Sequence, residues 1–166
     1  MNEEQLDKYL SRSCKTYGVY CRKLVAVGQT GFPDRLLVMT AINELIKAGV
    51  IKRVIVAVPA KVLAEDVWQN EAAKWPELVD VKIMGVRGSA SERVKLLRAG
   101  HSTSNVLVVS LNNLAWLLKE KHHADGVVID ELSKAAGKQA APLRTKRYGS
   151  KLKWRVGLTA TPVSQN

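Results

Sequence analysis

The sequence predicts an α/β fold in which a parallel sheet of about five strands is flanked by helices. Short apolar runs rich in β-branched residues alternate with longer segments in which apolar residues recur at helical spacing. The runs are apolar throughout, which is typical of parallel strands covered on both faces. Hydrophobic residues make up 46% of the 166 residues, which is enough for the core of one domain.

Three runs carry a strong strand signal and two carry a weaker one. The strong runs are Val54–Val58, Val106–Val109 and Gly126–Ile129, and the weaker ones are Val81–Met84 and Arg155–Leu158. We expect the three strong strands and the last weak one to be neighbours in the sheet.

Helical spacing predicts four helices between these strands: Thr40–Ala48, Leu63–Trp75, Ser91–Ala99 and Leu111–Lys121. Gly49 and Gly100 come directly after two of them, and a glycine in that position is a common signal for the end of a helix.

The first 39 residues have a different pattern. A helix over about Glu3–Tyr17 is followed by Lys23–Val27, by a turn with Gly28, Gly31 and Pro33, and by Arg35–Met39. We interpret this segment as a helix and hairpin appended to the sheet domain, with the boundary at Met39/Thr40. The predicted domains are therefore residues 1–39 and 40–166.

The formal net charge of +11 indicates a polyanionic partner, of which nucleic acid is the usual one. No acidic residue follows Glu131, whereas the same tail holds eight basic residues: Lys134, Lys138, Arg144, Lys146, Arg147, Lys151, Lys153 and Arg155. A solvated basic loop without a partner would have the same composition.

Two features bear on the compartment. The start is acidic and amphipathic and no apolar run reaches the length of a membrane helix, so we expect a cytoplasmic protein without a membrane partner. Cys14 and Cys21, the two cysteines, are expected to be reduced thiols and have no neighbours suited to zinc.

The distinctive polar clusters come after the predicted strands, where the carboxyl ends of parallel strands form binding sites. Pro59-Ala60-Lys61, Ser110-Leu111-Asn112-Asn113 and Thr159-Ala160-Thr161-Pro162 each come directly after a strand. Asp130 and Glu131 come after Gly126–Ile129. An aspartate there can hold Mg²⁺ and a neighbouring glutamate can activate water for attack on a γ-phosphate. An acidic strand end without chemistry would look the same.

The set as a whole resembles the first RecA-like lobe of superfamily 2 helicases, which are DEAD/DEAH-like, and within them the Swi/Snf-type group. VIVAVPAKVLAEDVWQNEAAKW is similar to motif Ia, VVSLNNLAWLL to motif Ib, VVIDELSKAAG to the Walker B box of motif II, and RVGLTATPVSQN to motif III. The resemblance covers Thr40–Asn166.

The resemblance implies a role for each cluster. Asp130 would bind Mg²⁺ and Glu131 would act on the hydrolytic water. Thr159 and Thr161 would couple the nucleotide site to DNA. The residues expected to bind nucleic acid, by the resemblance or by the charge of the tail, are Lys61, Ser110, Asn112, Asn113, Lys146, Arg147, Lys151 and Lys153.

One required motif is missing from the pattern. The Walker A loop, G-x-x-x-x-G-K-[ST], should precede the helix at Thr40, but that place holds VAVGQTGFPDRLLVM. GQTG imitates a fragment of such a loop without a Gly-Lys-Thr after it. Mg²⁺ and ATP are therefore implied by the resemblance alone, and we expect their binding to be weak or absent. The sequence contains no second motor lobe either.

Residues 1–39 have a resemblance of their own, to the opening of VRR-NUC nucleases, in the segment KLVAVGQTGFPDRLLVM. Asp34 would then be a metal ligand, with Glu4 as a candidate second one. The E-x-K strand that such nucleases need does not follow. This pattern would arise from a fusion of two incomplete enzymes, for which a phage or prophage genome in a bacterial host is the suspected origin.

We therefore expect a helicase-like ATPase lobe that is catalytically inactive and binds DNA, or RNA, without sequence preference. Three alternatives stay open: an ATPase with an unorthodox loop, a VRR-NUC-type metal-dependent nuclease built on Asp34, and a regulatory protein that mimics a helicase lobe and binds another protein.

Overall fold

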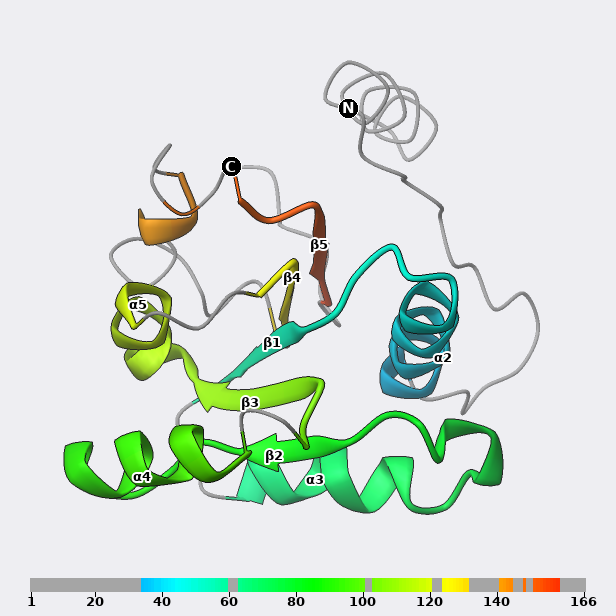
Figure 1. Ribbon diagram of the computed structural model, residues 1–166, viewed down its shortest axis with the longest axis horizontal. Coiled ribbons are helices and arrows are strands. Elements are labelled where there is room, and N and C mark those ends of the chain that lie inside the picture. The colour runs from blue at the N-terminus through cyan, green and yellow to red at the C-terminus, as the bar shows by residue number, and fades with distance from the viewer. Residues whose placement is uncertain are drawn as a thin grey trace, which may run out of the picture. The chain divides into compact units, whose positions relative to one another are not determined.

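The structure is a computed structural model that describes residues 34–59, 63–100, 103–120, 124–131, 141–144, 148 and 151–158. The helices are α2 (Asp34–Lys47), α3 (Leu63–Ala72), α4 (Ala90–Gly100) and α5 (Leu111–Lys119), with short 3-10 turns at η1 (Pro76–Leu78) and η3 (Ala141–Arg144). The strands are β1 (Val54–Val58), β2 (Ile83–Gly85), β3 (Val106–Ser110), β4 (Gly126–Ile129) and β5 (Trp154–Gly157). Figure 1 shows their arrangement.

The five strands form one sheet in the order β2-β3-β1-β4-β5, and every neighbouring pair is parallel. The expected fold class is confirmed, and β3, β1, β4 and β5 are contiguous as expected. Each strand is connected to the next along the chain by a crossover segment, which parallel pairing requires.

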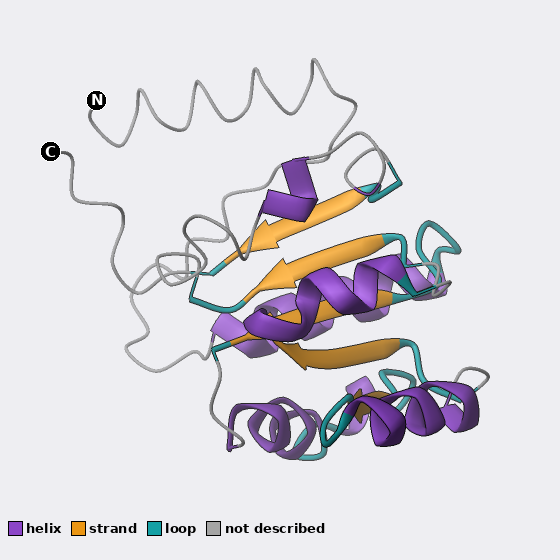
Figure 2. Cartoon of the chain, turned by 90° about the vertical axis from the view of Figure 1, so that its left-hand side faces the viewer, coloured by secondary structure: helices purple, strands orange, loops and turns teal. Residues whose placement is uncertain are grey.

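Helices cover both faces of the sheet, as Figure 2 shows. On one face α2 and α3 pack on Val54, Val56 and Val128 through side chains such as Met39 and Trp68. On the other face α4 and α5 pack on the alternate strand residues, among them Ile55 and Ile129. The alternation follows from the strand period of two. All five residues of β1 are buried, as expected for a central strand.

The prediction of a strand at Arg35–Met39 is wrong, because these residues form the first part of α2. Leu-Leu-Val-Met has the composition of a short strand, but Leu36, Met39 and Ile42 lie at helical spacing and are buried together.

The chain divides into two compact units between Pro33 and Asp34. The expected boundary at Met39/Thr40 therefore falls inside α2, and the nuclease-like segment before Asp34 lies outside the described residues.

The two predicted helix ends are confirmed, for different reasons. Gly49 has φ +68°, and the amides of Gly49 and Val50 donate to the carbonyls of Ile46 and Leu45 at 2.9 and 3.0 Å, which closes α2. Gly100 is the last residue of α4, at a place where a Cβ would collide with the sulfur of Met84, so a residue with a side chain fits poorly there. None of the described helices is long and apolar enough to cross a membrane.

Candidate functional site

The carboxyl ends of the three central strands form what we call the carboxyl edge of the sheet. Val58 at the end of β1 pairs with Ser110 of β3, and Ala57 pairs with Ile129 of β4. The amide of Asp130 then donates to the carbonyl of Ala57 at 2.9 Å and extends the ladder by one residue. Ser110 and Asp130 therefore flank the end of β1, as predicted for residues at strand ends.

The carboxylate of Asp130 is buried, with its side chain 8% exposed. Val128 packs under α2 and α3, so Asp130, two residues later, faces the same side of the sheet. Two donors meet its Oδ2 atom there. Nε of Arg35, from α2, and Nε1 of Trp68, from α3, both lie 3.1 Å away.

Arg35 is the second residue of α2, and its side chain is 37% exposed. Its positive charge also acts on a residue of α3, Glu71. The pKa of Glu71 is lowered mainly by a hydrogen bond from Lys74, against an opposing effect of burial, and to a smaller extent by the positive charge of Arg35. The ion pair of the guanidinium is with Asp130, and Glu71 feels its charge only weakly.

Glu131 has a left-handed backbone, with φ 58°, and is the only non-glycine residue with positive φ in the described part of the chain. A Cβ in this region crowds the backbone and costs about 1–2 kcal/mol. Such strain is often found beside functional sites. The left-handed residue follows Asp130 directly, two residues after the end of β4.

The partner threonines of the predicted site lie just beyond the described residues. The amide of Leu158 donates to the carbonyl of Ile129 at 2.8 Å, so Leu158, the residue before Thr159, lies next to the end of β4. Thr159 and Thr161 themselves are outside the described part, and so are Lys61, Lys146 and Arg147. Their predicted roles stay predictions.

Ser110 stands at the N-cap position of α5, but its side chain bonds to Asn113 and caps no helix amide. Ser110 has the extended backbone of an N-cap before α5, and Nδ2 of Asn113 donates to Oγ of Ser110 at 2.9 Å. Both side chains are half-buried, whereas Asn112 is exposed. Of these three predicted nucleic-acid contacts, Asn112 is the one most accessible to a ligand.

The opposite end of the sheet, which we call the amino edge, carries lysines. The residues that directly precede the five strands are already joined by main-chain hydrogen bonds of 2.6–3.0 Å. These bonds connect Lys82 to Asn105, Asn105 to Val54, Arg53 to Asp125, and Asp125 to Lys153. Lys52, Lys82, Lys151 and Lys153 are exposed along this row.

Asp125 is the acidic residue within the row, and its carboxylate is already engaged. Oδ2 accepts the amides of Lys52 and Arg53 at 2.7 and 3.2 Å, and Oδ1 lies 3.8 Å from Nζ of Lys153. Within the described part of the chain, the ammonium groups of Lys52, Lys82 and Lys151 have no acidic partner.

The structure therefore separates residues that the sequence grouped together. Ser110 and Asn112 lie at the carboxyl edge, but Lys151 and Lys153 precede β5 and lie at the amino edge. The sequence analysis did not select Lys52 and Lys82, because it considered the residues at the carboxyl end of each strand and the basic tail after Glu131. The signal that could have found them is a lysine one or two residues before a strand, which recurs at β1, β2 and β5.

The residues at Asp130 do not fit a bound Mg²⁺. The ion needs oxygen ligands at about 2.0–2.1 Å in an octahedron. One oxygen of Asp130 already accepts two hydrogen bonds, and one of the donors carries a positive charge. In the described part of the chain no three Asp, Glu, His or Cys side chains gather closely enough to hold a metal.

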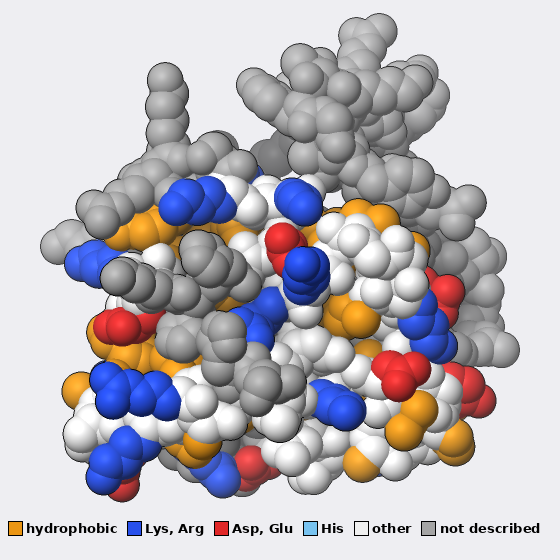
Figure 3. Space-filling view, in the orientation of Figure 1, with side chains coloured by type: hydrophobic (Ala, Val, Ile, Leu, Met, Phe, Trp, Pro, Cys, Tyr) orange, Lys and Arg blue, Asp and Glu red, His pale blue; other side chains and the backbone are white. Residues whose placement is uncertain are grey.

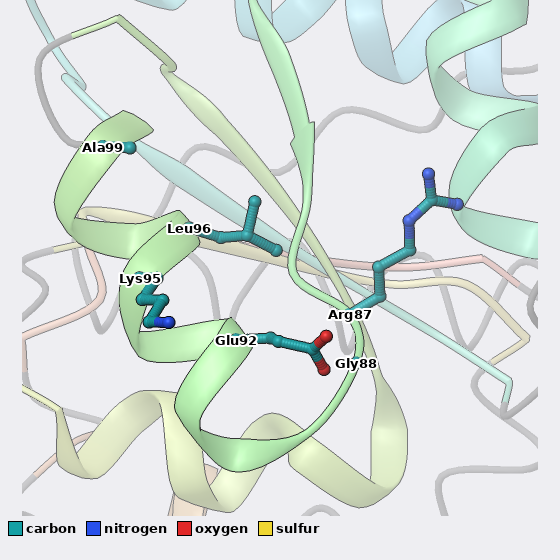
Figure 4. A pocket seen from close by; sticks show the side chains of 6 residues that line it. All are labelled: Arg87, Gly88, Glu92, Lys95, Leu96 and Ala99. Carbon is teal, nitrogen blue, oxygen red and sulfur yellow. The ribbon is translucent and has the colours of Figure 1, made fainter.

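A pocket of about 640 Å³ lies elsewhere, beside the end of β2 and the start of α4 (Figure 4). The residues that line it are Arg87, Gly88, Glu92, Lys95, Leu96 and Ala99. Glu92 is turned toward Gly88, and its carboxylate accepts the amide of Ser89 at 2.7 Å as in a capping box. Hydrogen bonds from the side chain and then from the backbone amide of Ser89 lower the pKa of Glu92. None of the residues predicted from the sequence lines this pocket.

Comparisons of the sequence with known proteins give one similar relative. No family model matches the chain. Protein p41 of Acyrthosiphon pisum secondary endosymbiont phage 1 is 30% identical over 135 residues, which cover 75% of this chain and 28% of that protein.

Two solved structures share the fold. The Sulfolobus solfataricus SWI2/SNF2 ATPase core in complex with dsDNA has a TM-score of 0.52 at 20% identity, covering 81% of this chain and 26% of that one. The C-terminal part of the Fun30 ATPase domain has a TM-score of 0.53 at 12% identity, covering 96% of this chain and 51% of that one. The chain spans about a quarter to a half of the length of these proteins. It has the RecA-like α/β fold found in SWI2/SNF2 ATPase cores, and its sequence is similar to that of a phage protein.

Proposed function

We propose that this RecA-like lobe binds nucleic acid without sequence preference and does not turn over ATP. The observation that carries the proposal is the row of exposed lysines at the amino edge, where the carboxylate of Asp125 is already hydrogen-bonded to the backbone. Ammonium groups without acidic partners attract a polyanion, and each phosphate they neutralise releases counterions.

The dimensions of the row suit a nucleic-acid backbone. Neighbouring strands are about 4.8 Å apart, so the four steps from β2 to β5 span about 19 Å. Duplex DNA carries one phosphate per strand for about every 3.4 Å of its axis, so this length corresponds to roughly five or six base pairs. Lys82 and Lys153 lie at the two ends of that span, and Lys52 lies near its middle.

The charge of the whole chain acts in the same direction. The net charge is +11, and Figure 3 shows Lys and Arg side chains spread over much of the face in view. One of the structural neighbours is a SWI2/SNF2 ATPase core in complex with dsDNA. These facts support duplex DNA as the first ligand to test, with RNA as the second.

Two independent features support the absence of ATP turnover. The sequence before α2 has no Gly-Lys-Thr to hold phosphates. Asp130, which the resemblance assigns to Mg²⁺, is ion-paired with Arg35 and hydrogen-bonded to Trp68. Glu131 therefore has no metal-bound nucleotide to act on. We expect no hydrolysis with or without DNA, and turnover that disappears in Glu131→Gln would contradict this.

The binding experiment measures the affinity of the purified chain for a labelled DNA duplex and for a single-stranded RNA by fluorescence anisotropy. An edge variant carries Lys52→Ala, Lys82→Ala, Lys151→Ala and Lys153→Ala. A matched helix variant carries Lys47→Ala, Lys74→Ala, Lys95→Ala and Lys119→Ala. These four lysines are also exposed but lie on or directly after the helices, so both variants lose the same charge.

The edge variant should bind at least tenfold more weakly than the helix variant, because local contacts add to the effect of net charge. Equal losses would mean that net charge alone attracts the nucleic acid. If the wild-type chain forms no complex even at low salt, the nucleic-acid proposal fails, and the remaining candidate is a protein that binds another protein through this fold.

A further inference from the structure

The contact between Arg35 and Asp130 joins three elements that are far apart in sequence. Arg35 comes from α2, Trp68 from α3 and Asp130 from the end of β4, and both donors lie 3.1 Å from the same carboxylate oxygen. Trp68 is fully buried and Asp130 is nearly so. A carboxylate in such a place is very unfavourable unless it is paired and hydrogen-bonded.

Two kinds of positive charge could balance Asp130. A divalent cation bound directly to the carboxylate would have to reach about 2.0–2.1 Å from one of its oxygens and keep several water molecules around it. The guanidinium of Arg35 needs no water and already makes a charged hydrogen bond of ordinary length. A cation approaching the same oxygen would meet the positive charge of Arg35 and would have to displace the indole N–H of Trp68 or the guanidinium.

We infer that Arg35 is the permanent counter-cation of Asp130, that it takes the place of the divalent cation which the resemblance assigns to this aspartate, and that the Asp130 carboxylate serves to hold α2 and α3 on the sheet. Arg35 is thus a positioning residue for the carboxyl edge. The inference deepens the proposed absence of ATP turnover without depending on it, because a chain without a phosphate loop could fail to hydrolyse ATP whether or not Asp130 binds a metal.

The first test is a double-mutant cycle on stability, measured by urea unfolding, with Arg35→Met, Asp130→Asn and the double variant. If the pair is coupled, the double variant is more stable than the sum of the single effects predicts. We expect the coupling to change the unfolding equilibrium constant by at least about tenfold. If Arg35→Met does not fold, Arg35→Gln, which also removes the charge but keeps a polar side chain, takes its place in the cycle.

The chain provides a matched control cycle in Arg87→Met and Asp66→Asn. Nη1 of Arg87 lies 3.2 Å from Oδ1 of Asp66, a distance close to that of the buried pair, but the two side chains are 56% and 46% exposed. Exposed pairs are screened by water, so we expect a coupling of about fivefold or less. Additive effects at Arg35 and Asp130, or a coupling no larger than in this control, would overturn the inference.

The second test uses Mn²⁺ as a probe and needs no variant of Arg35. Mn²⁺ is titrated against wild-type protein and against Asp130→Asn, with free Mn²⁺ followed by electron paramagnetic resonance. We expect the same signal for both proteins, because Arg35 keeps the cation away from Asp130. Mn²⁺ binding by the wild type that Asp130→Asn abolishes would show that the carboxylate is a metal site and would overturn the inference, whatever the nucleic-acid experiments show.

Discussion

The two edges of the sheet both carry charged side chains, but they differ in how these charges are satisfied. At the carboxyl edge, Asp130 is buried and bonded to Arg35 and Trp68, and Ser110 accepts a hydrogen bond from Asn113. At the amino edge, three lysines are exposed and lack acidic partners in the described part of the chain, while Asp125 is used by the backbone of Lys52 and Arg53.

The difference teaches that a residue in a motif-like position can be engaged by other side chains of the same chain. In a parallel α/β sheet, ligands are expected at the carboxyl edge, yet here the groups described there satisfy one another and hold helices in place. Among the described residues, the lysines that we propose to bind a polyanion lie at the other end of the strands. Changes at the carboxyl edge should therefore affect stability, and changes at the amino edge should affect binding.

The largest expected effect on stability is that of Asp130→Ala. It leaves Arg35 and the N–H of Trp68 without their acceptor, so the free energy of unfolding should fall by about 3 kcal/mol. Asp125→Ala, at the amino edge, removes the acceptor of two partly exposed amides and should cost about 1–2 kcal/mol. Urea unfolding measures both. Equal losses would contradict the difference between the edges.

For DNA binding the order of the two variants is reversed: Asp125→Ala should have the larger effect and Asp130→Ala the smaller one. Asp125→Ala removes a negative charge from the amino edge and should tighten binding a few-fold at low salt. Asp130→Ala should leave the affinity of the folded protein unchanged. Anisotropy titrations without urea, at a temperature low enough to keep both variants folded, test this. Weaker binding by Asp130→Ala would indicate that the carboxyl edge takes part.

Trp68→Phe should have the next largest effect. It keeps an aromatic ring in the core but loses the N–H that donates to Asp130, and a hydrogen bond to a charged group contributes about 1.5–3 kcal/mol. Trp75→Phe is the matched control, since Nε1 of Trp75 lies 3.5 Å from Glu71 on an exposed side chain. Its cost should be below about 0.5 kcal/mol. Thermal unfolding of both variants makes the comparison.

Glu131 tests the backbone strain at the carboxyl edge. Glycine tolerates φ 58°, whereas a β-branched residue does not. Glu131→Val should therefore be less stable than Glu131→Gly by about 1–2 kcal/mol. Equal stabilities of the two variants, measured by urea unfolding, would mean that the turn relaxes when the side chain is changed.

The smallest expected effect is a pH dependence at Glu71. Its pKa is lowered in the folded chain, first by the hydrogen bond from Lys74 and last by the charge of Arg35. A carboxyl group with a lowered folded pKa contributes stability that is fully present above its ordinary pKa of 4.5 and is lost as the pH falls through the folded value. Glu71→Gln should flatten the loss of stability in that acidic range. An unchanged pH profile would remove Glu71 as its cause.

Most of the sheet could be predicted from the sequence, because apolar runs and helical spacing are local signals. All five strands, and the helices apart from the start of α2, lie within a few residues of their predicted positions. The start of α2 could not be predicted, because Leu-Leu-Val-Met suits a strand and a helix equally. The packing of these residues against the sheet favours the helix. Local composition does not carry that information.

The position of the candidate site could be predicted from the sequence, but the contacts of its side chains could not. The strand period and the polar residues after β3 and β4 indicate which side chains reach the carboxyl edge. That Arg35, 95 positions before Asp130, ion-pairs with it depends on how α2 packs on the sheet. Because the local pattern places Arg35 in a strand of another domain, its partner could not be anticipated.

The most direct test of the difference between the edges is the salt dependence of DNA binding by the wild-type chain and the edge variant. If about four lysines contact phosphates, raising the salt concentration fourfold should weaken wild-type binding about a hundredfold. In the edge variant the slope should fall to less than half of the wild-type slope, with the helix variant retaining most of the wild-type slope. An edge variant with the full wild-type slope would contradict the proposed binding surface, because the phosphate contacts would then lie elsewhere on the chain.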